Sequence, residues 1–109
     1  MSDRSFYFDP DAEGLEVFLG PTEALLMDLM WRLGGLTAKK ALALIDSVPK
    51  PAHTTLITVL NRLVDKGLVR REKNGRSFVY HPLQTRETFL KERIERIRSS
   101  LRSNFPDCL

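Results

Sequence analysis

Four polar side chains recur at spacings that place them on one face of a helix predicted from Ala52 to Lys66. They are Thr54, Thr55, Thr58 and Arg62. Threonine hydroxyls and an arginine guanidinium hydrogen-bond to phosphates and base edges, and threonine methyls contact thymine. Nucleic acid repels carboxylates, and no acid occurs on this face before Asp65 at its far end. The face therefore has the chemistry of a helix that reads a DNA major groove, although threonines also suit a solvated surface helix.

A cluster of cations follows in the segment from Leu68 to Tyr80. Asn74-Gly75 within it predicts a β-hairpin, because both residues tolerate positive φ in a tight turn. The basic side chains on this hairpin are Arg70, Arg71, Lys73 and Arg76, against the single acid Glu72. Such a cluster repels itself unless a polyanion lies nearby. We predict that the hairpin, including Arg71, contacts phosphates or the minor groove.

No combination of residues predicts catalysis or a cofactor. His53 and His81 lie in separate predicted elements, and the sequence has neither a paired-carboxylate motif nor a glycine-rich phosphate loop. Cys108 is the only cysteine, which excludes an intrachain disulfide and a thiolate metal cluster. We therefore expect no enzyme activity, no metal site and no cofactor.

Three helices are expected before the hairpin. Gly20 can act as N-cap for a helix that begins at Pro21, with Glu23 in its first turn, and Gly34-Gly35 should end it. Its expected core positions are Leu25, Leu26, Leu29, Met30 and Leu33. Thr37 should cap a shorter second helix, and the prolines at 49 and 51 require a loop before the third. The third helix should bury Leu56, Val59, Leu60 and Leu63 and end at Gly67.

A final helix is predicted from Arg86 to about Ser103, capped by Thr85 after Pro82 closes the second strand. Its apolar positions are spaced four, three and four residues apart: Leu90, Ile94, Ile97 and Leu101. A narrow apolar row on a helix rich in charged residues is typical of a helix that pairs with another helix. We predict that these four residues form a dimerisation surface.

Length and charge are consistent with one small nucleic-acid-binding domain. A chain of 109 residues has room for one modest core. Residues 1–35 hold seven acids and two bases, whereas residues 36–109 hold fifteen bases and seven acids. This asymmetry directs one face of the protein toward a polyanion. No segment has the composition of a signal peptide or a membrane span, so we expect a cytoplasmic protein with no membrane partner.

The order of elements predicts a mainly α fold with a small β wing: a winged helix-turn-helix followed by a C-terminal dimerisation helix. We divide the chain into a partly ordered N-terminal arm at 1–18, a DNA-binding domain at 19–83, and a dimerisation helix with its tail at 84–109. The arm carries four aromatics, which we expect to pack on the body or on a partner subunit: Phe6, Tyr7, Phe8 and Phe18.

Residues 19–82 resemble the BlaI/MecI/CopY family of penicillinase and copper-responsive repressors. The matching stretches read LGPTEALLMDLMWRLGGLTAKKALALI and HTTLITVLNRLVDKGLVRREKNGRSFVYHP. The second is the more specific, with its threonine pair, a further threonine, Arg-Leu, Lys-Gly-Leu, Gly-Arg and a closing Tyr-x-Pro in register. Trp31 in the first helix also matches.

The resemblance implies a homodimer that binds a palindromic operator, with one winged helix on each half-site, and blocks transcription. The base-facing positions carried over are Thr54, Thr55, Thr58 and Arg62, with Arg76 and Tyr80 in the wing. His53 stands where many members have tyrosine or proline, and its role is left open.

Two departures limit what the family implies about induction. Copper-responsive members carry a cysteine-rich C-terminal motif that this sequence lacks, so copper sensing through thiolates is not expected. Other members have further dimerisation helices and are inactivated when a sensor-linked protease cuts an Asn-Phe bond, so such a sensor is a further possible partner. Asn104-Phe105 is such a pair, but it lies closer to the wing and precedes Pro106, so we interpret it as coincidental.

An alternative function is a protein-interaction module, in which the winged helix is a scaffold and the apolar row of the last helix binds a different partner. The polar face of the third helix and the basic hairpin favour DNA binding instead.

Overall fold

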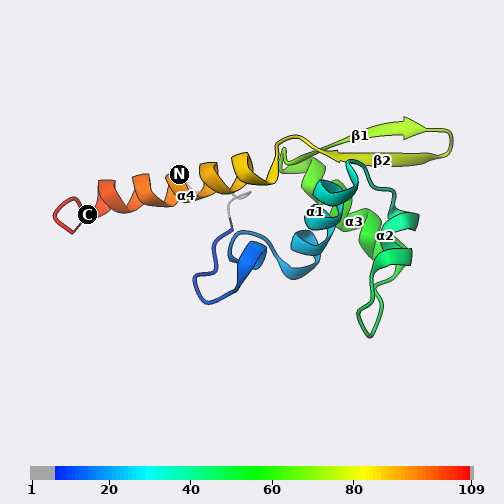
Figure 1. Cartoon of the computed structure of the whole chain (residues 1–109), viewed down its shortest axis with the longest axis horizontal. Helices are drawn as coiled ribbons and strands as arrows, with labels where there is room; N and C mark the ends of the chain where they lie inside the picture. The colour runs from blue at the N-terminus through cyan, green and yellow to red at the C-terminus, as the bar shows by residue number, and fades with distance from the viewer. Residues whose placement is uncertain (1–6, 109) are drawn as a thin grey trace.

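The computed structural model describes residues 7–108 as an elongated molecule with extents of 54 × 29 × 25 Å. The hairpin lies at one end and the last helix extends from the body at the other (Figure 1). The elements in order are η1 (Gly14–Val17), α1 (Pro21–Leu33), α2 (Ala38–Leu44), α3 (His53–Asp65), β1 (Val69–Asn74), β2 (Ser77–Pro82) and α4 (Arg86–Asn104). This is the predicted mainly α fold with a small β wing.

Helix starts lie where the capping residues predict them. Helix α1 begins at Pro21 with Gly20 as N-cap, and the Glu23 carboxylate accepts a hydrogen bond from the Gly20 amide at 3.2 Å. Thr37 caps α2 and Thr85 caps α4, each accepting from the backbone N–H three residues later. These side chains satisfy amides that the first turn of a helix leaves without partners.

The core is built mainly from α1 and α3, and α2, the hairpin and α4 add buried residues to it. All four predicted core residues of α3 are buried, whereas on α1 the expectation was partly wrong: Leu25 and Leu33 are exposed and Met27 is buried instead. The buried row of α1 runs through Glu23, Leu26, Met27 and Met30. Glu23 belongs to this row because its second carboxylate oxygen bonds Lys66, just after α3, at 2.8 Å. The ion pair ties the start of α1 to the end of α3.

The hairpin turn lies one residue later than predicted. Asn74 pairs with Ser77, so the two-residue loop is Gly75-Arg76 and Asn74 is the last residue of β1. Gly75 has φ +64°, and no residue other than glycine has positive φ in the described chain. A glycine at the first position of a two-residue loop is the arrangement of a type II′ turn. Arg76 therefore lies at the tip of the hairpin and not within the second strand.

A short bridge attaches the hairpin to the helices. Leu36 and Tyr80 exchange backbone hydrogen bonds of 2.9 and 2.8 Å, so the segment between α1 and α2 acts as a third short strand beside β2. Next to it, Gly35 lies against His81 so closely that a Cβ would fall 2.9 Å from the ring. The end of β2 that carries Tyr80 and His81 is thus packed directly on the helical body.

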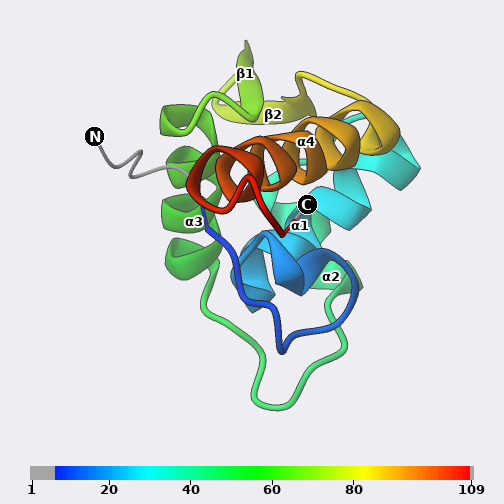
Figure 2. The same cartoon turned by 90° about the vertical axis from the view of Figure 1, so that its left-hand side faces the viewer.

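Helix α4 begins against α1 and then extends away from the body (Figures 1 and 2). The Trp31 indole N–H donates to the Gln84 carbonyl at 2.8 Å, and the Trp31 ring packs against Phe89 at 5.6 Å between centroids. Two of the four predicted dimerisation residues, Leu90 and Ile97, are partly buried against the chain's own core. The other two, Ile94 and Leu101, are 46% and 43% exposed.

In the described part of the N-terminal arm, Phe18 is buried in the core and Phe8 lies against it at 6.1 Å between ring centroids, whereas Tyr7 and Phe8 are both exposed. Phe6, one of the arm aromatics, lies outside the described residues. Within residues 7–108, no helix is both long enough and apolar enough to cross a membrane.

Candidate nucleic-acid interface

The outward face of α3 carries the four residues that the sequence selects. Thr54, Thr55, Thr58 and Arg62 are all exposed. They are exposed because the other side of the same helix is completely buried in the core. Within residues 7–108 the Arg62 side chain takes part in no hydrogen bond or ion pair, so its guanidinium donors are available to a ligand.

Thr58 differs from the other two threonines. Its hydroxyl donates to the Thr54 carbonyl at 2.9 Å, four residues earlier on the same helix. This internal bond uses its only donor, so Thr58 presents a methyl group and acceptor lone pairs. Of the two functions expected for the threonines, apolar contact with a thymine methyl fits Thr58 better than donation to a phosphate.

The wing is joined to α3 through Asn61, a residue that was not among the predicted DNA contacts. The Asn61 side-chain oxygen accepts hydrogen bonds from Arg71 of β1 at 2.8 Å and from the Tyr80 hydroxyl of β2 at 3.1 Å. Arg71 also lies over the Phe78 ring, 4.8 Å from its centroid. Two directly paired positions, Arg71 and Tyr80, thus bond the same atom of α3, and the guanidinium of Arg71 is held in one orientation.

The two predicted wing contacts differ in burial: Tyr80 is buried and Arg76 is exposed. Tyr80, a predicted DNA contact, is only 3% exposed, and its hydroxyl bonds Asn61. In the structure, Tyr80 therefore positions the wing against α3. Arg76 is exposed at the hairpin tip and has no hydrogen bond or ion pair to other residues in the described chain.

The two faces of the hairpin have different charge balance. Cross-strand pairs place Arg71, Lys73, Phe78 and Tyr80 on one face, toward α3. The single acid Glu72 lies on the other face, where it pairs with Arg70 at 3.1 Å. The face beside α3 therefore keeps its positive charge without a neutralising carboxylate. Such a surface attracts phosphates at long range.

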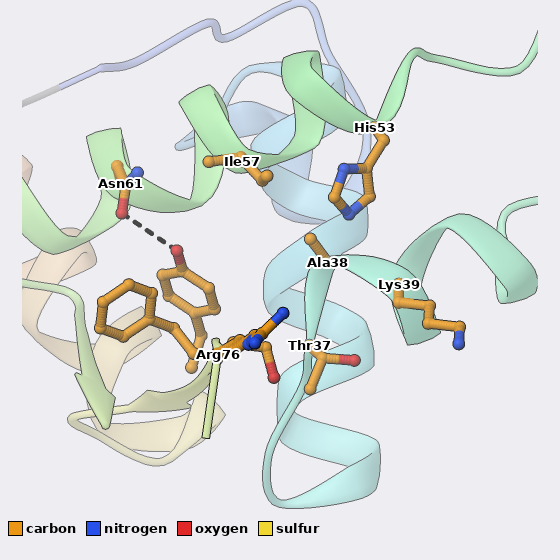
Figure 3. Close-up of a pocket in the computed structure, with 10 residues that line it drawn as sticks. Thr37, Ala38, Lys39, His53, Ile57, Asn61 and Arg76 are labelled. Carbon is orange, nitrogen blue, oxygen red and sulfur yellow. Dashed lines mark hydrogen bonds between the residues drawn. The ribbon is translucent and has the colours of Figure 1, made fainter. Parts of the chain in front are cut away.

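A cavity of about 490 Å³ separates α3 from the wing and the start of α2 (Figure 3). His53, whose role the sequence left open, points from α3 toward this cavity and toward the start of α2. Ile57 and Asn61 follow at helical spacing and line the same cavity. The row His53, Ile57, Asn61 lies beside the outward row, and helical spacing gives that position but not the contact of Asn61 with the wing.

Three helices, a two-stranded hairpin and a short strand paired to it define a winged helix-turn-helix protein. Residues 19–109 match the family described as penicillinase repressor. The chain belongs to this family.

Solved structures agree with that assignment. The DNA-binding domain of the repressor BlaI is 25% identical, with a TM-score of 0.55 over 62% of this chain and 83% of that one. The CopR repressor is 31% identical, with a TM-score of 0.51 over 71% of this chain and 99% of that one. A comparison with curated proteins finds no match.

Proposed function

We propose that this protein is a sequence-specific transcriptional repressor that binds a palindromic DNA operator as a homodimer. Helix α3 would enter the major groove of each half-site with Thr54, Thr55, Thr58 and Arg62, while Arg71 and Arg76 of the wing contact the neighbouring backbone. The observation that carries the proposal is the exposed face of α3, which is free of acids before Asp65 and lies beside the wing cation Arg71, which bonds Asn61. Membership of a repressor family supports the same function.

The proposed dimer uses the exposed side of α4. Ile94 and Leu101 leave apolar surface in solvent on a helix that projects from the body. Covering such residues stabilises by about 25 cal/mol for each Å² removed from water. A pair of α4 helices would cover both residues in each protomer and would direct two α3 helices to the same duplex.

Operator selection followed by a comparison of two arginine variants tests the proposal. Duplexes selected from a random pool by the full chain supply the operator panel, and fluorescence anisotropy measures affinity for each member. Arg62→Ala should cost about 1–3 kcal/mol and relax discrimination at one base pair. Arg71→Ala should weaken binding to all DNA sequences alike, and it should lower the slope of log affinity against log salt concentration by about one unit. Arg102→Ala, at the far end of α4, is the matched control and should leave both properties unchanged.

Two outcomes would contradict the proposal. If both arginine variants change the affinities for the panel of duplexes in the same way, α3 does not read bases. If the wild-type chain has no affinity for DNA at low salt, the interaction-module alternative is favoured.

A further inference from the structure

The cavity between α3 and the wing has a lining that DNA contact alone does not require. Its walls are largely apolar, and they come from α2, α3 and β2: Ala38, Ile57, Phe78 and Tyr80. A phosphate backbone needs cations and backbone amides, whereas an apolar wall of this kind suits the body of a small organic molecule. The volume of about 490 Å³ lies in the usual range of small-molecule sites.

Polar groups lie on two sides of the cavity, with His53 and Asn61 on α3 and Arg76 and Thr37 across from them. Arg76 extends from the hairpin tip toward Thr37 at the start of α2, whereas the Lys39 amine points away from the cavity (Figure 3). The Thr37 oxygen accepts from the Lys40 amide, which leaves its hydroxyl proton free to donate. One guanidinium and one hydroxyl beside an apolar wall match a molecule with a single anionic group and a flat apolar body.

The aromatic wall further defines the ligand. Phe78 is 37% exposed, although it lies beside Arg71 and at the edge of the cavity. Tyr80 is fixed behind it by the bond to Asn61. Aromatic rings prefer offset or edge-to-face contact with other rings, so a planar aromatic molecule can contact the exposed Phe78 ring, whereas Tyr80 is only 3% exposed and offers little surface.

We propose that this cavity binds a small planar aromatic anion, such as an aromatic carboxylate, with the anionic group on Arg76 and Thr37 and the ring between Ile57 and Phe78. Because α3 and the wing form its walls, an occupied cavity would oppose the approach of a DNA backbone between them. This second half of the proposal, in which the anion acts as an inducer, rests on the proposed DNA-binding function.

Naphthoate and its neutral analogue naphthylmethanol are suitable probes, because they share a ring system and differ in charge. Titration of the full chain, followed by amide NMR, should shift the signals of residues 37–39, 53 and 76–78. Arg76→Ala should weaken the affinity for naphthoate about fivefold and leave the affinity for naphthylmethanol unchanged. Phe78→Ala should weaken the affinity for both probes. Arg102→Ala and Leu83→Ala, which change an exposed cation and an exposed apolar residue elsewhere, should change neither.

Shifts concentrated on α4, or an affinity for naphthoate that does not depend on Arg76, would overturn the site. Competition against the selected operator then tests regulation, and naphthoate should raise the apparent Kd for DNA while naphthylmethanol does so less. If naphthoate occupies the cavity without affecting DNA binding, its role as an inducer is overturned and the binding site stands. If the chain binds no DNA, the proposed function fails, and the titration without DNA still decides whether the cavity is a site.

Discussion

Asn61→Ala should separate the wing from α3 and destabilise the fold, because one oxygen atom holds both strands of the hairpin. That oxygen accepts from Arg71 at 2.8 Å and from the Tyr80 hydroxyl at 3.1 Å. Tyr80 is 3% exposed, so a hydroxyl without its acceptor costs about 1–3 kcal/mol. Arg71 is exposed and regains water, so its bond adds at most about 1 kcal/mol. We expect a loss of about 2 kcal/mol in the free energy of unfolding.

Urea denaturation at fixed protomer concentration measures this loss, since a dimer makes the midpoint depend on concentration. The matched control is Asn104→Ala, which removes an exposed asparagine on α4 and should change the free energy by less than about 0.5 kcal/mol. A double-mutant cycle with Tyr80→Phe isolates the bond. The double variant should be more stable than additivity predicts, by about 1 kcal/mol. Strict additivity of the two changes would refute the reasoning.

Three further changes test separate parts of the structure. Ile94→Asp puts a carboxylate on the exposed apolar row of α4 and should yield monomers in sedimentation experiments; a dimer that persists would show that another surface pairs. Gly35→Ala places a Cβ 2.9 Å from the His81 ring and should lower the free energy of unfolding by about 1–2 kcal/mol, as measured by thermal unfolding. Adding His81→Ala should restore part of this stability, and a loss without recovery would contradict the contact. Glu23→Ala removes the buried partner of Lys66, and we expect a loss of about 2 kcal/mol by urea denaturation, about half of it restored in Glu23→Gln; an unchanged midpoint would argue against the ion pair.

The elements that the sequence predicts well are those with local signals. Gly20-Pro21, Thr37 and Thr85 mark helix starts through bonds within one turn, so no distant contact is needed to place them. The core face of α3 is also correct, because its polar and apolar rows are cleanly separated around the helix.

Features that depend on contacts between distant segments were missed. The hairpin loop lies one residue later than Asn74-Gly75 indicates, because pairing register also depends on where Tyr80 is buried beside Leu36. Likewise, Asn61 resembles any polar residue on a helix surface until β1 and β2 lie against it. The DNA contacts and the dimerisation row remain predictions, because they concern partners that the single chain does not contain.

In the proposed dimer, the packing of α4 on α1 would set the distance between the two winged helices. Trp31 holds the beginning of α4 through one hydrogen bond and one ring contact, and Leu90 and Ile97 pack on the core farther along the helix. With 19 residues, α4 is about 28 Å long, so a tilt of about 10° at Trp31 moves its far end by about 5 Å. That displacement exceeds the rise of one base pair, about 3.4 Å. In the proposed dimer, a substitution beneath the Trp31 indole would change the preferred spacing of the operator halves without altering any residue that faces DNA.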